Sequence, residues 1–145
     1  MAQTATRISQ VGTVFVPVAD QDRALEFYVG TLGFEKRGDF PYGEGSRWVE
    51  VAPPGSAIAI ALVPASEGGA PGGDETYCAL STDDIDATHE ALRARGVAVD
   101  PDVARDGRPR QLLYDTGRRM GNATVPPMFF FRDVDGNRFL MVEAA

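Results

Sequence analysis

The fold of this 145-residue chain is decided by the sequence VGTVFVPVADQDRALEFYVGTLG, which spans residues 11–33. Its first part is rich in β-branched and aromatic residues and predicts a strand over residues 11–18. Asp20 then offers a side-chain N-cap, and the apolar residues that follow recur at helical spacing. Gly33 stands where a glycine commonly ends a helix. The stretch therefore predicts a strand followed by a helix.

The same order of signals returns 63 residues later. Three pairs of residues share this offset, namely Asp20 and Asp83, Ala24 and Ala87, and Gly33 and Gly96. Either Asp83 or Asp84 can cap the second helix. Strand-like runs follow the first helix at 34–40, 47–52 and 57–63, with a turn-rich segment at 41–45, and the second unit has such runs at 75–81, 97–103, 128–132 and 137–143. A constant offset indicates an internal repeat, and a single sheet with coincidental spacing is the alternative.

The repeat predicts an α+β protein with one domain over residues 1–145. Its two strand–helix–strand–strand–strand (βαβββ) modules span residues 8–64 and 75–145, and the Gly- and Pro-rich segment 65–74 links them. A twisted half-sheet with one helix on its outer face leaves its inner face uncovered. Two such half-sheets are expected to enclose a cavity, so functional residues should lie on the inward-pointing strand positions.

Composition excludes several classes of function. The net charge of −7 argues against nucleic acid as a partner, because phosphate binding needs a basic surface. No apolar run has the length of a membrane helix or of a signal peptide, and Cys78 is the only cysteine. We expect a cytoplasmic protein without a disulfide.

Two segments carry a family resemblance. VADQDRALEFY at 18–28, ending in TLGF, resembles the first strand–helix signature of the vicinal oxygen chelate superfamily, which includes glyoxalase, bleomycin-resistance protein and extradiol dioxygenase. FRDVDGNRFLMVE at 131–143 resembles its C-terminal hairpin, with Val134 where proline is usual. The resemblance implies paired modules that form an eight-stranded, cup-shaped mixed sheet with helices outside, often in a homodimer.

The resemblance also implies four metal-ligand positions on the inner face. In metal-dependent members these hold a histidine or glutamine, a carboxylate, a histidine and a glutamate. Here the positions fall on Thr13, Ala61 (or Ala59), Tyr77 and Leu140, none of which suits a catalytic metal. Shifting the register by two residues brings in only Glu75 as a possible ligand. We therefore predict neither a metal site nor a cofactor.

The predicted cup is a mixed pocket instead. Its expected lining residues are Thr13, Phe15, Trp48, Glu50, Ala59, Ala61, Tyr77, Ala79, Tyr114 and Leu140. Aromatic surfaces above small alanines suit a planar or aromatic ligand, although the cup's own side chains could also fill it. Glu50 is the candidate acid, base or cation partner if it points inward, and a solvent-exposed glutamate at a strand edge if it does not.

His89, Cys78 and the segment 104–127 are weaker candidates for a functional role. His89 lies in the second helix, outside the cup, and is expected to be a partly buried structural residue. Cys78 is expected to face the core and not to act as a nucleophile. The long segment 104–127 contains Arg105, Arg108, Arg110, Arg118 and Arg119. It is either a lid that brings arginine to an anionic ligand or a region of solvated charge or dimer contact.

These residues favour a metal-free protein that sequesters a small aromatic or drug-like molecule. The alternative is a metal-independent lyase or isomerase that uses Glu50, Glu75 or Tyr77 for proton transfer. A metal-dependent glyoxalase or dioxygenase conflicts with the residues at the ligand positions. The expected partners are a small molecule and a second copy of the chain, with no nucleic acid and no membrane.

Overall fold

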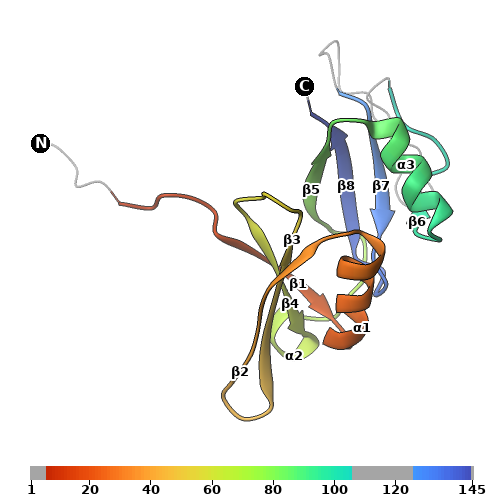
Figure 1. Cartoon of the computed structure of the whole chain (residues 1–145). Coiled ribbons are helices and arrows are strands. Elements are labelled where there is room, and N and C mark those ends of the chain that lie inside the picture. Colours follow the sequence, from red (N-terminus) through yellow and green to blue (C-terminus); the bar gives the residue numbers. More distant parts are fainter. Residues whose placement is uncertain (1–5, 106–125, 145) are drawn as a thin grey trace, which may run out of the picture.

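The computed structural model describes residues 6–105 and 126–144 and contains two βαβββ modules (Figure 1). The first module consists of β1 (Thr13–Val18), α1 (Gln21–Leu25), η1 (Glu26–Thr31), β2 (Glu35–Tyr42), β3 (Ser46–Ala52) and β4 (Ala59–Pro64). The short helix α2 (Ala65–Gly68) begins the connection, and the second module consists of β5 (Thr76–Thr82), α3 (Ile85–Ala94), β6 (Ala98–Val99), β7 (Met128–Arg132) and β8 (Arg138–Glu143). The predicted α+β class and the predicted pair of modules are confirmed.

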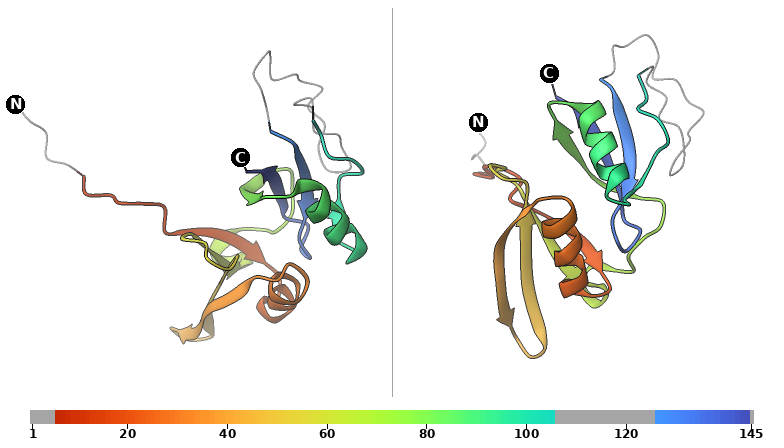
Figure 2. Two further views of the ribbon diagram at one scale, coloured as in Figure 1. Left: turned by 45° about the horizontal axis from the view of Figure 1, so that its top comes forward. Right: turned by 45° about the vertical axis from the view of Figure 1, so that its right-hand side comes forward.

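The two modules have the same sheet topology. The strand orders are β1-β4-β3-β2 and β5-β8-β7-β6, and in each module the first and last strands pair in parallel. Among the residues that the structure describes, the strands form two four-stranded sheets and do not join into one eight-stranded sheet. In the right-hand view of Figure 2, α1 and α3 each lie in front of their own sheet. The sheet faces that carry no helix therefore point to the opposite side of the molecule.

The helix boundaries follow the sequence signals. Asp20 Oδ1 accepts a hydrogen bond from Arg23 N at 3.1 Å, and Asp84 Oδ1 accepts one from Ala87 N at 3.0 Å. Asp84, not Asp83, is therefore the second cap. Gly33 and Gly96 both have φ +80, a conformation that glycine adopts without strain. The first module has one more residue between cap and glycine, and the wider π-helical winding of η1 accommodates an inserted residue of this kind.

The modules are joined through a buried polar contact. Tyr28, fully buried on η1, donates its hydroxyl to Asp133 Oδ2 at 2.5 Å. Asn137 Nδ2 donates to Pro17 O at 2.8 Å and to Asp133 Oδ2 at 2.9 Å. Burial, and then the neighbouring Asp133 carboxylate, raise the pKa of Tyr28 well above its usual value. The C-terminal Asp–Gly–Asn turn thus binds one module to the other.

Two segments differ in detail from the sequence prediction. The strand predicted at 97–103 is reduced to β6 because Pro101 follows it and has no backbone N–H for sheet pairing. Part of the predicted linker is α2, which approaches the first sheet so closely that a Cβ on Gly68 would lie 2.5 Å from Val63 Cγ2. Glycine is therefore required where α2 packs on the sheet.

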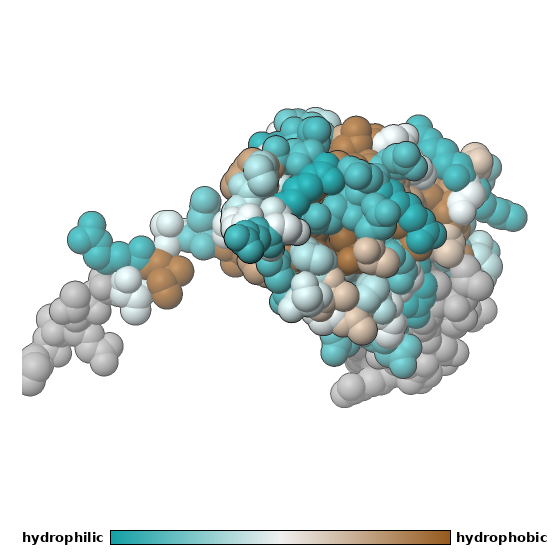
Figure 3. Space-filling view, turned by 90° about the horizontal axis from the view of Figure 1, so that it is seen from below, coloured by the Kyte–Doolittle hydropathy of each residue, from teal (hydrophilic) through white to brown (hydrophobic). Residues whose placement is uncertain are grey.

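The N-terminal segment before β1 extends away from the body of the molecule (Figure 3). Its apolar residues Ile8 and Val11 are 82% and 60% exposed. None of the helices in the described part of the chain is long and apolar enough to span a membrane.

Candidate ligand-binding site

The uncovered face of the first sheet gathers six of the predicted cup residues. On β1 and β4, Thr13 lies opposite Ala59 and Phe15 lies opposite Ala61. Glu50 on β3 is paired with Ala61. Residues that are directly opposite in neighbouring strands point to the same face of a sheet, and alternate residues share a face. The residues that come together in this way are Thr13, Phe15, Trp48, Glu50, Ala59 and Ala61.

The Glu50 carboxylate is fixed on this face by two neutral donors. Trp48 Nε1 donates to Glu50 Oε2 at 3.0 Å, and Thr13 Oγ1 donates to Glu50 Oε1 at 3.3 Å. Phe15 packs edge-on against the Trp48 indole, with ring centroids 5.7 Å apart and an interplanar angle of 76°. Glu50 therefore lies among the aromatic side chains of the first sheet's helix-free face.

Two aromatic residues of this face were missed in the sequence. Phe40 on β2 lies directly opposite Trp48, and Tyr42 packs against Trp48 with ring centroids 6.3 Å apart. The sequence assigned Tyr42 to a turn, whereas β2 continues through it and pairs Tyr42 with Ser46. Reading β2 and β3 as a hairpin closed by a tight turn would have placed both rings beside Trp48.

Helix α2 bounds one end of the face. Gly68 packs against Pro17 and Val63, which continue the uncovered side of β1 and β4. The Tyr42 hydroxyl donates to the Glu67 carboxylate of α2. We call the whole surface the aromatic face and define it by Thr13, Phe15, Phe40, Tyr42, Trp48, Glu50, Ala59 and Ala61.

Tyr77 does not join the aromatic face because β5 is bulged. Thr76 pairs with Arg138 and Ala79 with Leu140, so Tyr77 and Cys78 together lie opposite the single residue Phe139. Tyr77 packs against Phe139, with ring centroids 6.4 Å apart, at the hydrophobic core. A strict alternation from Ala79 cannot anticipate the bulge. Tyr114, also predicted to line the cup, lies outside the described residues.

The face of the second sheet that carries no helix includes Ala79 and Leu140, and it holds a buried, charged side chain. Arg138 is 5% exposed, and its Nε donates to Thr76 Oγ1 at 2.9 Å. Its guanidinium lies 5.3 Å from the centroid of the Phe130 ring, and Phe130 is itself buried. The two modules therefore share a fold but differ in the side chains on the sheet face that carries no helix.

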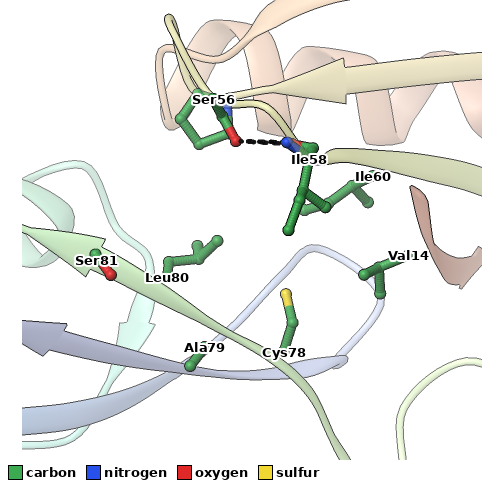
Figure 4. Close-up of a pocket in the computed structure, with 9 residues that line it drawn as sticks. Val14, Ser56, Ile58, Ile60, Cys78, Ala79, Leu80 and Ser81 are labelled. Atoms are coloured by element: carbon green, nitrogen blue, oxygen red, sulfur yellow. Dashed lines mark hydrogen bonds between the residues drawn. The ribbon is translucent and has the colours of Figure 1, made fainter. Parts of the chain in front are cut away.

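A cavity of about 320 Å³ lies between the modules, on the other side of β1 and β4. It is lined mainly by aliphatic side chains, including Val14, Ile58, Ile60 and Leu80, with Ser56 at its rim (Figure 4). The sulfur of Cys78 points into it, toward Val14 and Ile58 (Figure 4). Burial raises the pKa of the Cys78 thiol to about 11, so the thiol is a poor nucleophile at neutral pH.

The described residues contain no group of three His, Cys, Asp or Glu side chains that could hold a metal ion. His89 is buried in α3, where its Nε2 lies 2.7 Å from Asp100 O and its ring packs against Phe129. Glu75, the alternative proton-transfer residue, is exposed and directly precedes β5. Glu50 is the carboxylate that this geometry places among the predicted site residues.

The fold, the strand order and the C-terminal hairpin are consistent with one protein superfamily. The family described as the Glyoxalase/Bleomycin resistance protein/Dioxygenase superfamily matches residues 8–141, and the chain belongs to it. A protein of Bacillus subtilis (strain 168), YetH, described as uncharacterized, is 30% identical over 136 residues, covering 94% of this chain and 99% of the relative.

Solved structures are also similar to this chain. TnmS3, an antibiotic binding protein from Streptomyces sp. CB03234, is 34% identical with a TM-score of 0.73 and covers 97% of this chain and 100% of its own. A member of the superfamily from Sphaerobacter thermophilus DSM 20745 is 33% identical with a TM-score of 0.75, over 94% of this chain and 98% of its own.

Proposed function

We propose that this protein binds and sequesters a small aromatic, drug-like molecule on the aromatic face. The observation that carries the proposal is the set of four aromatic side chains contributed by β1, β2 and β3 above the small residues of β4. Phe15 and Phe40 are 53% and 52% exposed, which is unusual for large apolar residues on a strand face. Flat rings above an alanine floor leave room for a planar ligand to stack.

The similarity to TnmS3 supports this proposal, because that protein is described as an antibiotic binding protein and aligns over nearly all of both chains. The residues at the family's metal-ligand positions support binding over metal-assisted chemistry, because threonine, alanine, tyrosine and leucine are poor ligands for catalytic metals. A metal-independent enzyme remains the second candidate, since Glu50 provides a carboxylate at the same place.

Trp48 provides a direct assay, because it is the only tryptophan in the chain and lies on the aromatic face. A planar aromatic antibiotic should quench its fluorescence. Phe40→Ala removes a ring that can stack on the ligand, which should weaken binding about tenfold. Val29→Ala is the matched control, because Val29 is an exposed apolar residue on η1, away from this face.

Equal affinity in Phe40→Ala and the parent protein, or quenching by none of a panel of planar antibiotics, would contradict the proposed site. Product analysis of the same mixtures separates the two candidate functions. A ligand recovered unchanged supports sequestration, whereas turnover that disappears in Glu50→Gln supports the enzyme.

We also propose that the protein acts as a homodimer. The exposed Ile8 and Val11 of the extended N-terminal segment support this, because they offer apolar surface for a second copy to cover. Light scattering in solution measures the state directly, and a monomeric mass at micromolar concentration would contradict it.

A further inference from the structure

We propose that the aromatic face selects planar ligands that carry a positive charge, and that Glu50 is the residue that selects for the charge. This inference rests on the proposed function and adds the chemical class of the ligand. It is carried by the charges around Glu50 and by a comparison of matching positions in the two modules.

Among the residues that the structure describes, only neutral groups donate hydrogen bonds to Glu50. Its two oxygens accept from the Trp48 indole and the Thr13 hydroxyl. Within residues 6–105 and 126–144, no lysine or arginine forms an ion pair with Glu50. The basic side chains of the first module that form ion pairs do so with other carboxylates. These pairs are Arg47 with Asp22 and Asp39, Lys36 with Asp39, and Arg37 with Glu35. A carboxylate half-buried in this way favours a cation in the ligand.

A second carboxylate lies at the edge of the same surface. Glu67 accepts a hydrogen bond from the Tyr42 hydroxyl and, like Glu50, has no ion-pair partner in the part of the chain that the structure describes. Two carboxylates on one side of a protein of net charge −7 attract cations and repel anions. The exposed ring faces act in the same direction, because the electron-rich face of an aromatic ring attracts a cation.

The second module has an arginine at the position that corresponds to Ala59 in the first module. Thr13 lies opposite Ala59 in the first module, and Thr76 lies opposite Arg138 in the second. The next pairs match as well, because Glu50 pairs with Ala61 where Phe130 pairs with Leu140. Arg138 thus corresponds to Ala59, and Phe130 corresponds to Glu50.

This correspondence indicates where the charged group of a bound ligand would lie. In the second module the guanidinium of Arg138 lies over the Phe130 ring. In the first module the matching residue Ala59 has no charged group, and Glu50 has a carboxylate where the second module has the Phe130 ring. A positively charged group of a ligand that stacks on Phe15, Phe40 or Trp48 would reach Glu50 where the second module places its own arginine.

The test uses two probes that differ in one methyl group and one charge. N-methylacridinium is a permanent planar cation, and acridine is its uncharged parent at mildly alkaline pH. Quenching of Trp48 fluorescence and equilibrium dialysis measure both affinities. We expect the parent protein to bind the cation about tenfold more tightly than acridine, and Glu50→Gln to bring the ratio of the two affinities close to one.

The control is Glu90→Gln, which makes the same change of charge on an exposed residue of α3 and should keep the preference for the cation. Glu50→Asp keeps the carboxylate and should also retain it, which guards against a folding defect in Glu50→Gln. Equal binding of both probes by the parent protein, or a preference that survives Glu50→Gln, overturns the inference and leaves the proposed function standing. If neither probe binds, nor any planar antibiotic, both are rejected.

Discussion

The two faces of the first sheet are built from alternate residues of the same strands, yet they have opposite environments. Along β1, Val16 and Val18 are fully buried against the helix and the second module, whereas Phe15 between Val14 and Val16 is 53% exposed. Along β3, Val49 and Val51 are buried, whereas Trp48 and Glu50 contribute to the aromatic face. One face belongs to the hydrophobic core, and the other carries the proposed ligand site.

Alternate residues of one strand therefore have different roles: those on the helix side stabilise the fold, and their neighbours form the proposed binding face. We call the face with Val16, Val18, Val49 and Val51 the closed face. It belongs to the apolar core, on the same side as the contact between Tyr28 and Asp133. The aromatic face adds side chains that contact one another but cover little of the core. Substitutions on the closed face should therefore change the free energy of unfolding, and substitutions on the aromatic face should change affinity.

The largest effect on stability is expected from Asp133→Ala. The carboxylate of Asp133 accepts hydrogen bonds from Tyr28 and Asn137 side chains and from the backbone N–H groups of Asp135 and Asn137. Its removal leaves buried donors unpaired, which should lower the free energy of unfolding by about 3 kcal/mol or more. Urea denaturation followed by circular dichroism measures this.

Tyr28→Phe is the milder companion change. It removes one hydroxyl and keeps the ring, so it should lower the free energy of unfolding by about 1–2 kcal/mol. A loss below about 0.5 kcal/mol in both variants would show that the contact between the modules is not a main source of stability.

A smaller effect is expected from alkaline pH. Burial raises the pKa of Cys78 from 9.0 to about 11 and raises that of Tyr28 above its usual 10.0. Because the unfolded chain ionises at the ordinary values, the stability from these neutral groups is complete below the unfolded pKa. It is lost as the pH rises through the folded pKa. The free energy of unfolding, measured from roughly pH 8 to pH 11, should decline between the thiol's ordinary pKa of 9.0 and its folded value of about 11.

Cys78→Ala should flatten the first part of that decline, since the remaining groups with a raised pKa are the tyrosines Tyr28, Tyr42 and Tyr77, whose ordinary pKa is 10.0. An unchanged dependence on pH in this variant would mean that the Cys78 thiol does not lie in the cavity, where Figure 4 places it.

The smallest effect on stability is expected on the aromatic face. Glu50→Gln keeps an amide oxygen for one of the two donors, and Phe40 is half-exposed, so Glu50→Gln and Phe40→Ala should each change the free energy of unfolding by less than about 0.5–1 kcal/mol. Differential scanning calorimetry without ligand is the measurement. A loss as large as that of Asp133→Ala would break the separation between the two faces.

Much of this architecture could be predicted because its signals are local. Asp20 and Gly33 mark the ends of the first helix by their own hydrogen-bonding and conformational preferences, and the second unit repeats them. Strand alternation placed Thr13, Phe15 and Glu50 on one face, and the register of β1, β3 and β4 brings them together. Phe40 and Tyr42 were missed because a hairpin's register depends on where its turn closes.

The sequence by itself determined the repeated module, the capped helices and the residue types at the family's metal-ligand positions, because each depends on neighbours along the chain. Tertiary structure alone decided that the sheets stay separate, that the bulge in β5 turns Tyr77 toward Phe139, and that Arg138 occupies the second module's face. These depend on which strands pair and how closely they pack, which no single segment encodes. The same pairing places Ala59 where its counterpart is an arginine, which is the difference on which the proposed cation site at Glu50 rests.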